Sequence, residues 1–508
     1  MECSNRAAIT RREAMRALVA ASIGAMMPPL TRGASESVHG AYDFAPVRER
    51  ILKAVANGQA TGVAVAVAQD GRIVWEGGFG WANREAGLKT TAHTPFSLAS
   101  ITKPFTTTTL MMLVAEGKLS LDEPANKYLQ NGKITGPNGN PDGATIRRLG
   151  AHAGGLPSMF EHFFPDEATK PPSAGMLLRD YGRLAYAPGS CYEYSNIGYS
   201  ALGAIAANLT GTEFGALMKR RVLEPLGLHN SFFGTDTARL KTSAVRYDDS
   251  GNPIPYYTTS TPASGEVYAS AHDLARFAMF NLKNDLGLTS RILDARWIDE
   301  LHQPVFVGPS GAATTFGWFS GSTKSGLRTI FKSGGQPGVA TTMYMVPSEN
   351  LAYLALTNRS DGGEFAFGIC DQILATILPE WTQPDETVGS SRSPFRVTPE
   401  FLGLWEGTLS NGGADMPARL EIRSSDTATL ALGDKPAEGI ADMQSEGRAL
   451  TGRTVGMIES ADALRNEATN LTLKLTPQDE KLVGRILASA KKPGTLIPYV
   501  LTLNRKPS

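Results

Sequence analysis

The stretch Ser100-Ile101-Thr102-Lys103 decides the fold and the chemistry of this 508-residue chain. It follows a short apolar segment, and the run from Pro104 to Glu116 behind it predicts a helix. Residues three apart share one face of a helix, so we expect the Lys103 amine beside the Ser100 hydroxyl. Serine becomes a nucleophile when a base takes its proton. Lysine can be that base when burial or nearby positive charge lowers its pKa.

The start of this helix also offers a place for negative charge. The Ser100 backbone N–H at the helix N-terminus can donate to an oxyanion. Ser-x-x-Lys alone is a weak pattern, and a second match at Ser489-Ala490-Lys491-Lys492 lies in a segment that reads as a solvated turn. The interpretation of Ser100 therefore depends on its partners.

Two further motifs are candidates for such partners. Tyr194-Ser195-Asn196 opens a predicted helix, where a phenol can relay a proton and an amide can both donate to and accept from a substrate. The alternative is a buried aromatic residue with an asparagine helix cap. Lys332-Ser333-Gly334-Gly335 follows the apolar residues 329–331 and precedes a second strand-like run. Small residues at a strand edge let a substrate backbone lie alongside.

The order of predicted elements indicates two parts. Residues 44–380 predict one mixed α/β unit, in which Asp70-Gly71 predicts a hairpin and Phe316-Phe319 a later strand. A helical middle separates the early strands from the late ones. Residues 381–399 are rich in Pro, Ser and Asp and predict a linker. Short strand-like runs from 400 to 508 predict a small antiparallel barrel or sandwich.

Composition excludes several function classes. The chain has 49 basic and 49 acidic residues, so nucleic acid and anionic membranes are poor candidates as partners. The three cysteines show no metal or disulfide spacing, and none of the seven histidines lies three to five residues from another. We therefore expect no metal site and no cofactor.

The N-terminus has the features of an export signal. Arg11-Arg12 precedes the apolar run from Ala17 to Met27, and small residues follow around Gly33. The run is too short to span a bilayer, which takes about 20 helical residues. Residues 1–34 therefore predict a signal peptide of the twin-arginine type and a periplasmic or secreted bacterial protein. The alternative is a disordered tail with a chance arginine pair.

The three motifs in this order resemble those of the β-lactamase and penicillin-binding serine hydrolases, most closely the branch of class C β-lactamases, DD-peptidases and esterases. Leu149 to Pro157 resembles a loop of that branch, although Ala153 and Gly154 depart from it. The resemblance implies an α/β (α+β) β-lactamase/transpeptidase-like fold over residues 35–380. That fold has an antiparallel sheet flanked by helices and a helical subdomain. Residues 400–508 resemble the lipocalin-like β-barrel that some members carry.

The resemblance also implies a role for each motif residue. Ser100 would be acylated, and Lys103 would share its proton with Tyr194. Asn196 would hold the substrate amide, and Lys332 would bind a substrate carboxylate and support the tyrosinate. The remaining implied site residues are Ser333 and Gly334 for substrate binding, and the amides of Ser100 and Gly335 for the oxyanion hole. His152 is expected to be structural.

These residues favour a serine hydrolase that cleaves an amide or ester of a carboxylate-bearing substrate, either a β-lactam or a D-amino-acid peptide. A carboxylesterase of small neutral esters is an alternative; it ranks second because ester-cleaving relatives often have an apolar residue where this chain has Lys332. A non-catalytic penicillin-binding sensor is another, although a binding module does not need the Ser100, Lys103 and Tyr194 set. The C-terminal part is expected to shape substrate access or form a homo-oligomer.

Overall fold

The hairpin predicted around Asp70-Gly71 begins the main sheet. In a computed structural model, which describes residues 35–38, 42–287, 292–322, 326–379, 392–410, 415–490 and 494–507, it joins β2 (Gly62–Gln69) to β3 (Arg72–Asn83). Asp70 and Gly71 have φ of 52° and 75°, the positive values that tight hairpin turns require. The predicted signal peptide, residues 1–34, lies outside the described residues.

The main sheet is antiparallel and brings the two ends of the predicted α/β unit together. Its central contact pairs β2 with β17 (Leu351–Thr357), so an early strand lies beside the last one. The strand order is β1-β3-β2-β17-β16-β15-β14-β13-β12, with β4 on β3. The other strands are β1 (Ser35–Val38), β16 (Val339–Val346), β15 (Arg328–Gln336), β14 (Phe319–Ser322), β13 (Ala313–Thr314), β12 (Phe306–Val307) and β4 (Leu88–Lys89).

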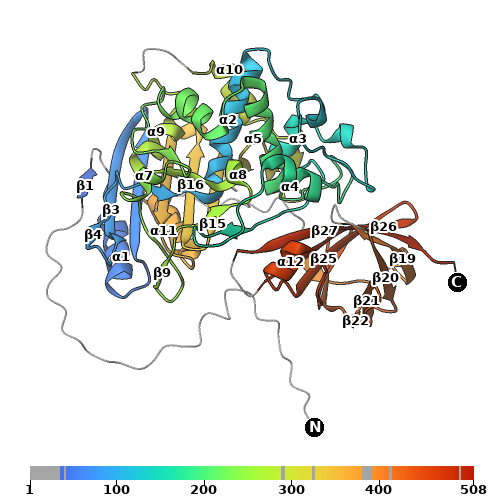
Figure 1. Ribbon diagram of the computed structural model, residues 1–508. Coiled ribbons are helices and arrows are strands. Elements are labelled where there is room, and N and C mark those ends of the chain that lie inside the picture. The colour runs from blue at the N-terminus through green and yellow to red at the C-terminus, as the bar shows by residue number, and fades with distance from the viewer. Residues whose placement is uncertain are drawn as a thin grey trace, which may run out of the picture. The chain divides into compact units, whose positions relative to one another are not determined.

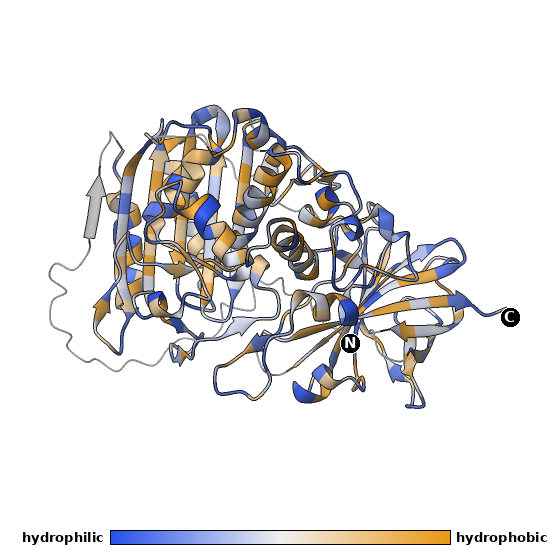
Figure 2. Ribbon diagram, turned by 45° about the horizontal axis from the view of Figure 1, so that its top comes forward, coloured by the Kyte–Doolittle hydropathy of each residue, from blue (hydrophilic) through white to orange (hydrophobic). Residues whose placement is uncertain are grey.

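The β2 sequence shows why both faces of this sheet are covered. Its valines 63, 65 and 67 pack with α1 (Ala45–Ala56) and α11 (Gly363–Ile377), while its alanines 64, 66 and 68 face the other way. The small alanines let α9 (Ala271–Asn281) approach the sheet closely. Apolar residues are accordingly concentrated in the strands of this sheet, as Figure 2 shows.

Helices and short ladders fill the chain between the early and late strands, as predicted, and α2 lies among these helices, in contact with α5 and α10 (Figure 1). Among the described residues, every helix is too short or too polar to span a bilayer. The remaining helices are α2 (Thr102–Ala115), α3 (Ile146–Gly150), α4 (Ala174–Tyr181), α5 (Asn196–Thr210), α6 (Phe214–Met218), α7 (Thr237–Leu240), α8 (Pro262–Gly265) and α10 (Ala295–Leu301). The short strands are β5 (Phe96–Ser97), β6 (His162–Phe163), β7 (Phe232–Phe233), β8 (Arg246–Tyr247), β9 (Pro253–Ile254), β10 (Thr258–Thr259) and β11 (Val267–Ala269).

A second, ten-stranded antiparallel sheet follows, within the same compact unit from Ala34 onward. It is a curled half-barrel, because within the described part of the chain no ladder joins its edge strands β18 and β22. The predicted antiparallel fold class is confirmed; the likeness to lipocalins stays a prediction. The order is β18 (Arg392–Pro394), β23 (Ala441–Glu446), β24 (Ala449–Val455), β25 (Asn470–Gln478), β26 (Lys481–Ser489), β27 (Leu496–Arg505), β19 (Gly403–Ser410), β20 (Met416–Ile422), β21 (Ala428–Leu432) and β22 (Glu438–Gly439), with helix α12 (Ala461–Arg465).

The predicted linker is only partly described. Its residues 381–391 lie outside the described residues. Residues 392–394 form β18, which pairs with β23 of the second sheet.

Candidate active site

Ser100 lies on a single 3₁₀ turn, η1 (Ala99–Ile101), directly before α2. Ala99 has a φ of 47°, a left-handed conformation that is strained for a residue with a side chain. Strand β15 packs against this turn so closely that a Cβ on Gly334 would lie 2.1 Å from the Leu98 carbonyl oxygen and 3.0 Å from the Ser100 amide nitrogen. Glycine at 334 is therefore required for the strand to reach the serine.

The Lys103 amine meets Ser100 as the i,i+3 spacing predicts. Its Nζ lies 3.1 Å from Ser100 Oγ and donates to Asn196 Oδ1 at 2.8 Å and to the Ser264 carbonyl at 3.1 Å. The side chain is fully buried, and among the described residues no carboxylate pairs with it. Burial, and then the positive charge of Lys332, hold the pKa of Lys103 well below its ordinary value.

Tyr194 completes the group around Ser100. Its phenol donates to Ser100 Oγ at 2.7 Å, and its ring lies 4.1 Å from the His152 ring, centroid to centroid, in a stacked arrangement. Burial raises the pKa of Tyr194, so the phenol is neutral at ordinary pH. His152 accepts from the Ser195 amide through Nδ1, and burial lowers its pKa well below the usual range. The neutral imidazole thus positions Tyr194.

Asn196 is the first residue of α5 and is fully buried. Its Oδ1 accepts from Lys103, and its Nδ2 donates to the Met159 carbonyl at 3.0 Å. Each atom keeps one hydrogen-bonding position, so the predicted contact with a substrate amide stays a prediction. The contact that the structure shows is an orienting one, because Asn196 fixes the Lys103 amine.

Lys332 approaches the same group from β15. Its Nζ lies 5.4 Å from the Tyr194 ring centroid and 4.0 Å from that of Phe319, and its side chain is 1% exposed. Burial lowers its pKa to about 7. Strand β14 pairs with β15 only from Arg328 to Phe331. Within the described residues, the edge of β15 from 332 to 336 therefore has no strand beside it on that side.

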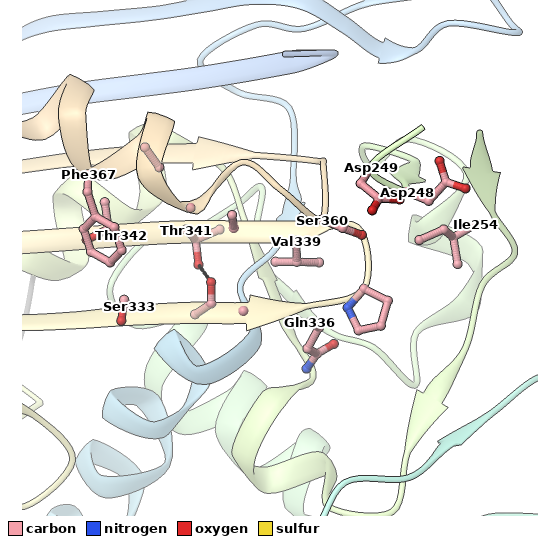
Figure 3. Close-up of a pocket in the computed structure, with 16 residues that line it drawn as sticks. Asp248, Asp249, Ile254, Ser333, Gln336, Val339, Thr341, Thr342, Ser360 and Phe367 are labelled. Atoms are coloured by element: carbon pink, nitrogen blue, oxygen red, sulfur yellow. Dashed lines mark hydrogen bonds between the residues drawn. The ribbon is translucent and has the colours of Figure 1, made fainter. Parts of the chain in front are cut away.

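The other two predicted residues of this motif lie further along the strand. Gly335 is exposed, with open space where a Cβ would be, and it pairs with Ala340 on β16. Ser333 is half-buried and lines a cavity of about 570 Å³ that Thr342 and Phe367 also line (Figure 3). Among the described residues, no hydrogen bond joins Ser333 to Ser100, Lys103 or Tyr194. The structure thus brings together Ser100, Lys103, Tyr194, Asn196 and Lys332.

One set of contacts was missed by the motif search. Glu193, directly before Tyr194, is 5% exposed at its side chain and forms ion pairs with Arg485 on β26 and, at 3.5 Å, with Lys474 on β25. Lys474 also pairs with Glu446 at 2.7 Å. Two strands of the second sheet therefore hold the segment that carries Tyr194 in place through ion pairs with Glu193. No sequence signal could have revealed this, because the partners are almost 300 positions apart.

A cavity of about 670 Å³ lies along this junction and reaches Tyr192, two residues before Tyr194 of the candidate site. Tyr192 lines it from one side, and Glu446, Lys474 and Val483 of the second sheet line it from the other. The rings of Tyr192 and Phe319 contact each other edge to face, with their centroids 6.4 Å apart. Phe319 also contacts Lys332, so this one side chain lies between Tyr192 of the cavity and Lys332 of the candidate site.

Comparison with known proteins places this site in a family. The chain is 31% identical over 225 residues to a β-lactamase of Pseudomonas fluorescens, covering 44% of this chain and 60% of that protein. It is 25% identical over 311 residues to protein flp of Staphylococcus aureus (strain COL), covering 59% and 60%. The chain thus spans about three fifths of the length of these curated relatives.

Two solved structures share the fold. An octameric penicillin-binding protein homologue from Pyrococcus abyssi has a TM-score of 0.57 at 22% identity, over 90% of this chain and 100% of that one. A class C β-lactamase has a TM-score of 0.56 at 19% identity, over 69% and 100%. The family model described as "Beta-lactamase" matches residues 47–375, which hold every residue of the candidate site. The chain belongs to the beta-lactamase family.

Proposed function

We propose that this protein is a serine hydrolase that forms a covalent acyl-enzyme on Ser100. The observation that carries the proposal is the position of Ser100 Oγ, 3.1 Å from Lys103 Nζ and 2.7 Å from Tyr194 Oη. A neutral lysine amine has two N–H groups and one lone pair. Asn196 and Ser264 accept from the two N–H groups, so the lone pair is left for the Ser100 proton.

The same hydrogen bonds supply the acylation step. Ser100 gives its proton to Lys103 while its oxygen attacks the substrate carbonyl carbon. The carbonyl electron pair moves to the oxygen, where the Ser100 and Gly335 amides would hold the negative charge. Support for this oxyanion site comes from the close approach of Gly334 to the Ser100 amide, which brings β15 to the serine.

Tyr194 is suited to the second half of the step. When the bond to the leaving group breaks, the departing nitrogen or oxygen needs a proton, and burial keeps the Tyr194 phenol protonated. The phenol recovers its proton from the charged Lys103 amine. A water molecule then cleaves the acyl-enzyme, with the same side chains moving the proton in reverse.

Lys332 favours a substrate that carries a carboxylate. It is a buried cation that pairs with no carboxylate among the described residues, beside an open strand edge and close to Tyr194. A charge-assisted contact with a substrate carboxylate would offset the free-energy cost of burying the positive charge of Lys332. We therefore propose a β-lactam or a D-amino-acid peptide as substrate, ahead of a neutral ester.

Mass spectrometry of the intact protein tests this function directly. Wild type is incubated with a penicillin, a D-alanyl peptide and a nitrophenyl ester, and the adduct is mapped by peptide digestion. We expect an acyl adduct on Ser100 with the first two compounds, and none with Ser100→Ala. An adduct on another residue, or turnover by Ser100→Ala above a tenth of wild type, would overturn the assignment.

Assembly is a further part of the proposal. The similar protein from Pyrococcus abyssi is described as octameric, which supports a homo-oligomer for this chain through its second sheet. Light scattering during size-exclusion chromatography tests it, and a monomeric mass at micromolar concentration would contradict it.

A further inference from the structure

Three side chains that no catalytic step uses meet on the surface of the main sheet. Glu76 comes from β3, His272 from the first turn of α9, and His93 from the turn between β4 and β5. Their ligand atoms all lie within 4.8 Å of one another. The two histidines are far apart in sequence, so their spacing gave no sign of this group.

The distances within the group suit one metal ion. Glu76 Oε2 lies 2.9 Å from His272 Nδ1, and Glu76 Oε1 lies 3.9 Å from His93 Nε2. Tetrahedral Zn²⁺ has ligands at about 2.0–2.1 Å, which places neighbouring ligand atoms about 3.3 Å apart. The observed separations bracket this value, and the 3.9 Å gap is too long for a hydrogen bond.

The backbone holds the three residues in this arrangement. The His272 amide donates to the Ala92 carbonyl, next to His93, at 3.1 Å. The His93 turn is closed by hydrogen bonds between Thr91 and Thr94. A Cβ on Gly78 would lie 2.3 Å from Thr91, so β3 also packs tightly against the turn. The group is therefore largely preformed, which lowers the cost of binding an ion.

The charges of the group point the same way. The Glu76 side chain is 13% exposed, and the ion pairs that the described residues form with it come from these two imidazoles alone. The two imidazole rings lie 4.6 Å apart, centroid to centroid, in a tilted arrangement. A dication among these ligand atoms would contact all three groups at once. Two imidazoles and one carboxylate are the donors that Zn²⁺ prefers, whereas Mg²⁺ and Ca²⁺ prefer oxygen alone.

We propose that Glu76, His93 and His272 form a binding site for a divalent transition-metal ion of the Zn²⁺ class, with a fourth position open to solvent. His93 provides that opening, because its side chain is 52% exposed. The ion links β3, α9 and the segment that leads through β5 to Ser100. Its first effect is therefore on the stability of that segment.

Calorimetric titration of the full chain, without a histidine tag and stripped by a chelator, tests the site with ZnCl₂. We expect one Zn²⁺ per chain, a raised Tm, and no response to MgCl₂. His93→Gln, His272→Gln and Glu76→Gln should each weaken Zn²⁺ binding by about tenfold or more, since even outer-shell partners of metal ligands matter by 10–100-fold. His229→Gln and Cys191→Ser, at an exposed and a half-buried residue elsewhere, are matched controls and should bind as wild type does.

Cobalt spectroscopy separates direct ligation from an indirect effect. Co²⁺ bound to the wild type should give visible absorption bands that disappear in His93→Gln, whose exposed position leaves the fold intact by circular dichroism. Zn²⁺ affinity that is equal in wild type and all three variants would overturn the site. Absence of Zn²⁺ binding to a folded wild-type chain would overturn it as well.

Discussion

Replacing Lys332 by methionine should stabilise the fold while it impairs the reaction. Burial lowers the pKa of Lys332 to about 7 from its ordinary value of 10.5, which the unfolded chain retains. The unfolded state therefore binds this proton more tightly, and the lysine destabilises the fold at every pH below 10.5. The penalty is complete below pH 7 and disappears above pH 10.5. Methionine has a similar length, no charge, and a sulfur that packs well against the Phe319 ring.

The size of this effect follows from the shift of the pKa. With 1.36 kcal/mol for each pKa unit, Lys332→Met should gain about 4 kcal/mol at pH 7 and only about 2 kcal/mol at pH 9. Urea unfolding at the two pH values measures the gain. Lys53→Met, at an exposed position on α1, is the matched control and should change the free energy of unfolding by less than about 0.5 kcal/mol. A variant less stable than wild type at pH 7, or a gain that does not shrink by pH 9, would refute the reasoning.

The same variant separates two roles of Lys332 in the reaction. A lost contact with a substrate carboxylate should lower kcat/KM for a penicillin by about ten- to a hundredfold, and much less for a neutral ester. The positive charge of Lys332 also lowers the pKa of Lys103, so the acid limb of the pH profile should move to higher pH in the variant. Equal losses of kcat/KM on both substrates would refute a contact between Lys332 and the substrate carboxylate. The effect of Lys332 on the pKa of Lys103 would then be its remaining role.

Three further outcomes are expected. The proposed acylation step needs a neutral Lys103 amine, so kcat/KM should fall as the pH drops through the lowered pKa of Lys103, and a rate that rises toward acid pH would contradict this. Lys103→Arg should be inactive at every pH, because arginine stays charged. Arg485→Met leaves Glu193 with Lys474 alone, so it should cost about 3 kcal/mol of stability and lower kcat more than it raises KM. Arg423→Met, at an exposed residue directly after β20, should do neither, and an unchanged kcat in Arg485→Met would remove its positioning role. Replacing Arg11 and Arg12 by lysine should leave precursor in the cytoplasm, as fractionation would show, and normal export would exclude the twin-arginine route.

The parts of the fold that the sequence predicted are those set by local physics. Alternating residues and a turn with positive φ specify β2 and β3, and the start of α2 places Lys103 beside Ser100 without any distant contact. Strand β15 was predicted only up to Phe331, because serine and glycine are poor strand formers. Pairing with β16 and close packing on Leu98 extend it to Gln336. The predicted strand at 316–319 begins only at Phe319, since Gly317 turns the chain with a φ of 101°.

The parts that could not be predicted depend on distant partners. The three motifs identified the residues of the candidate site themselves. No local sequence pattern, however, predicts that Asn196 accepts a hydrogen bond from Lys103 or that Arg485 pairs with Glu193. Likewise, His93, His272 and Glu76 meet only because β3, a turn and α9 are adjacent in the folded chain. Such contacts follow from topology, which a motif search does not see.

The ion pairs between the second sheet and Glu193 affect when the candidate site can be completed during synthesis of the chain. Ser100 and Lys103 leave the ribosome long before Arg485, which lies far along the chain after them. Domains generally fold from the N-terminus as they emerge. A nascent chain that already has its serine and lysine therefore still lacks the contacts that lock its tyrosine. If the proposed hydrolase activity is correct, it should appear only after β26, which carries Arg485, has been made and has paired with Glu193, and a product truncated before Arg485 should react poorly with acyl donors.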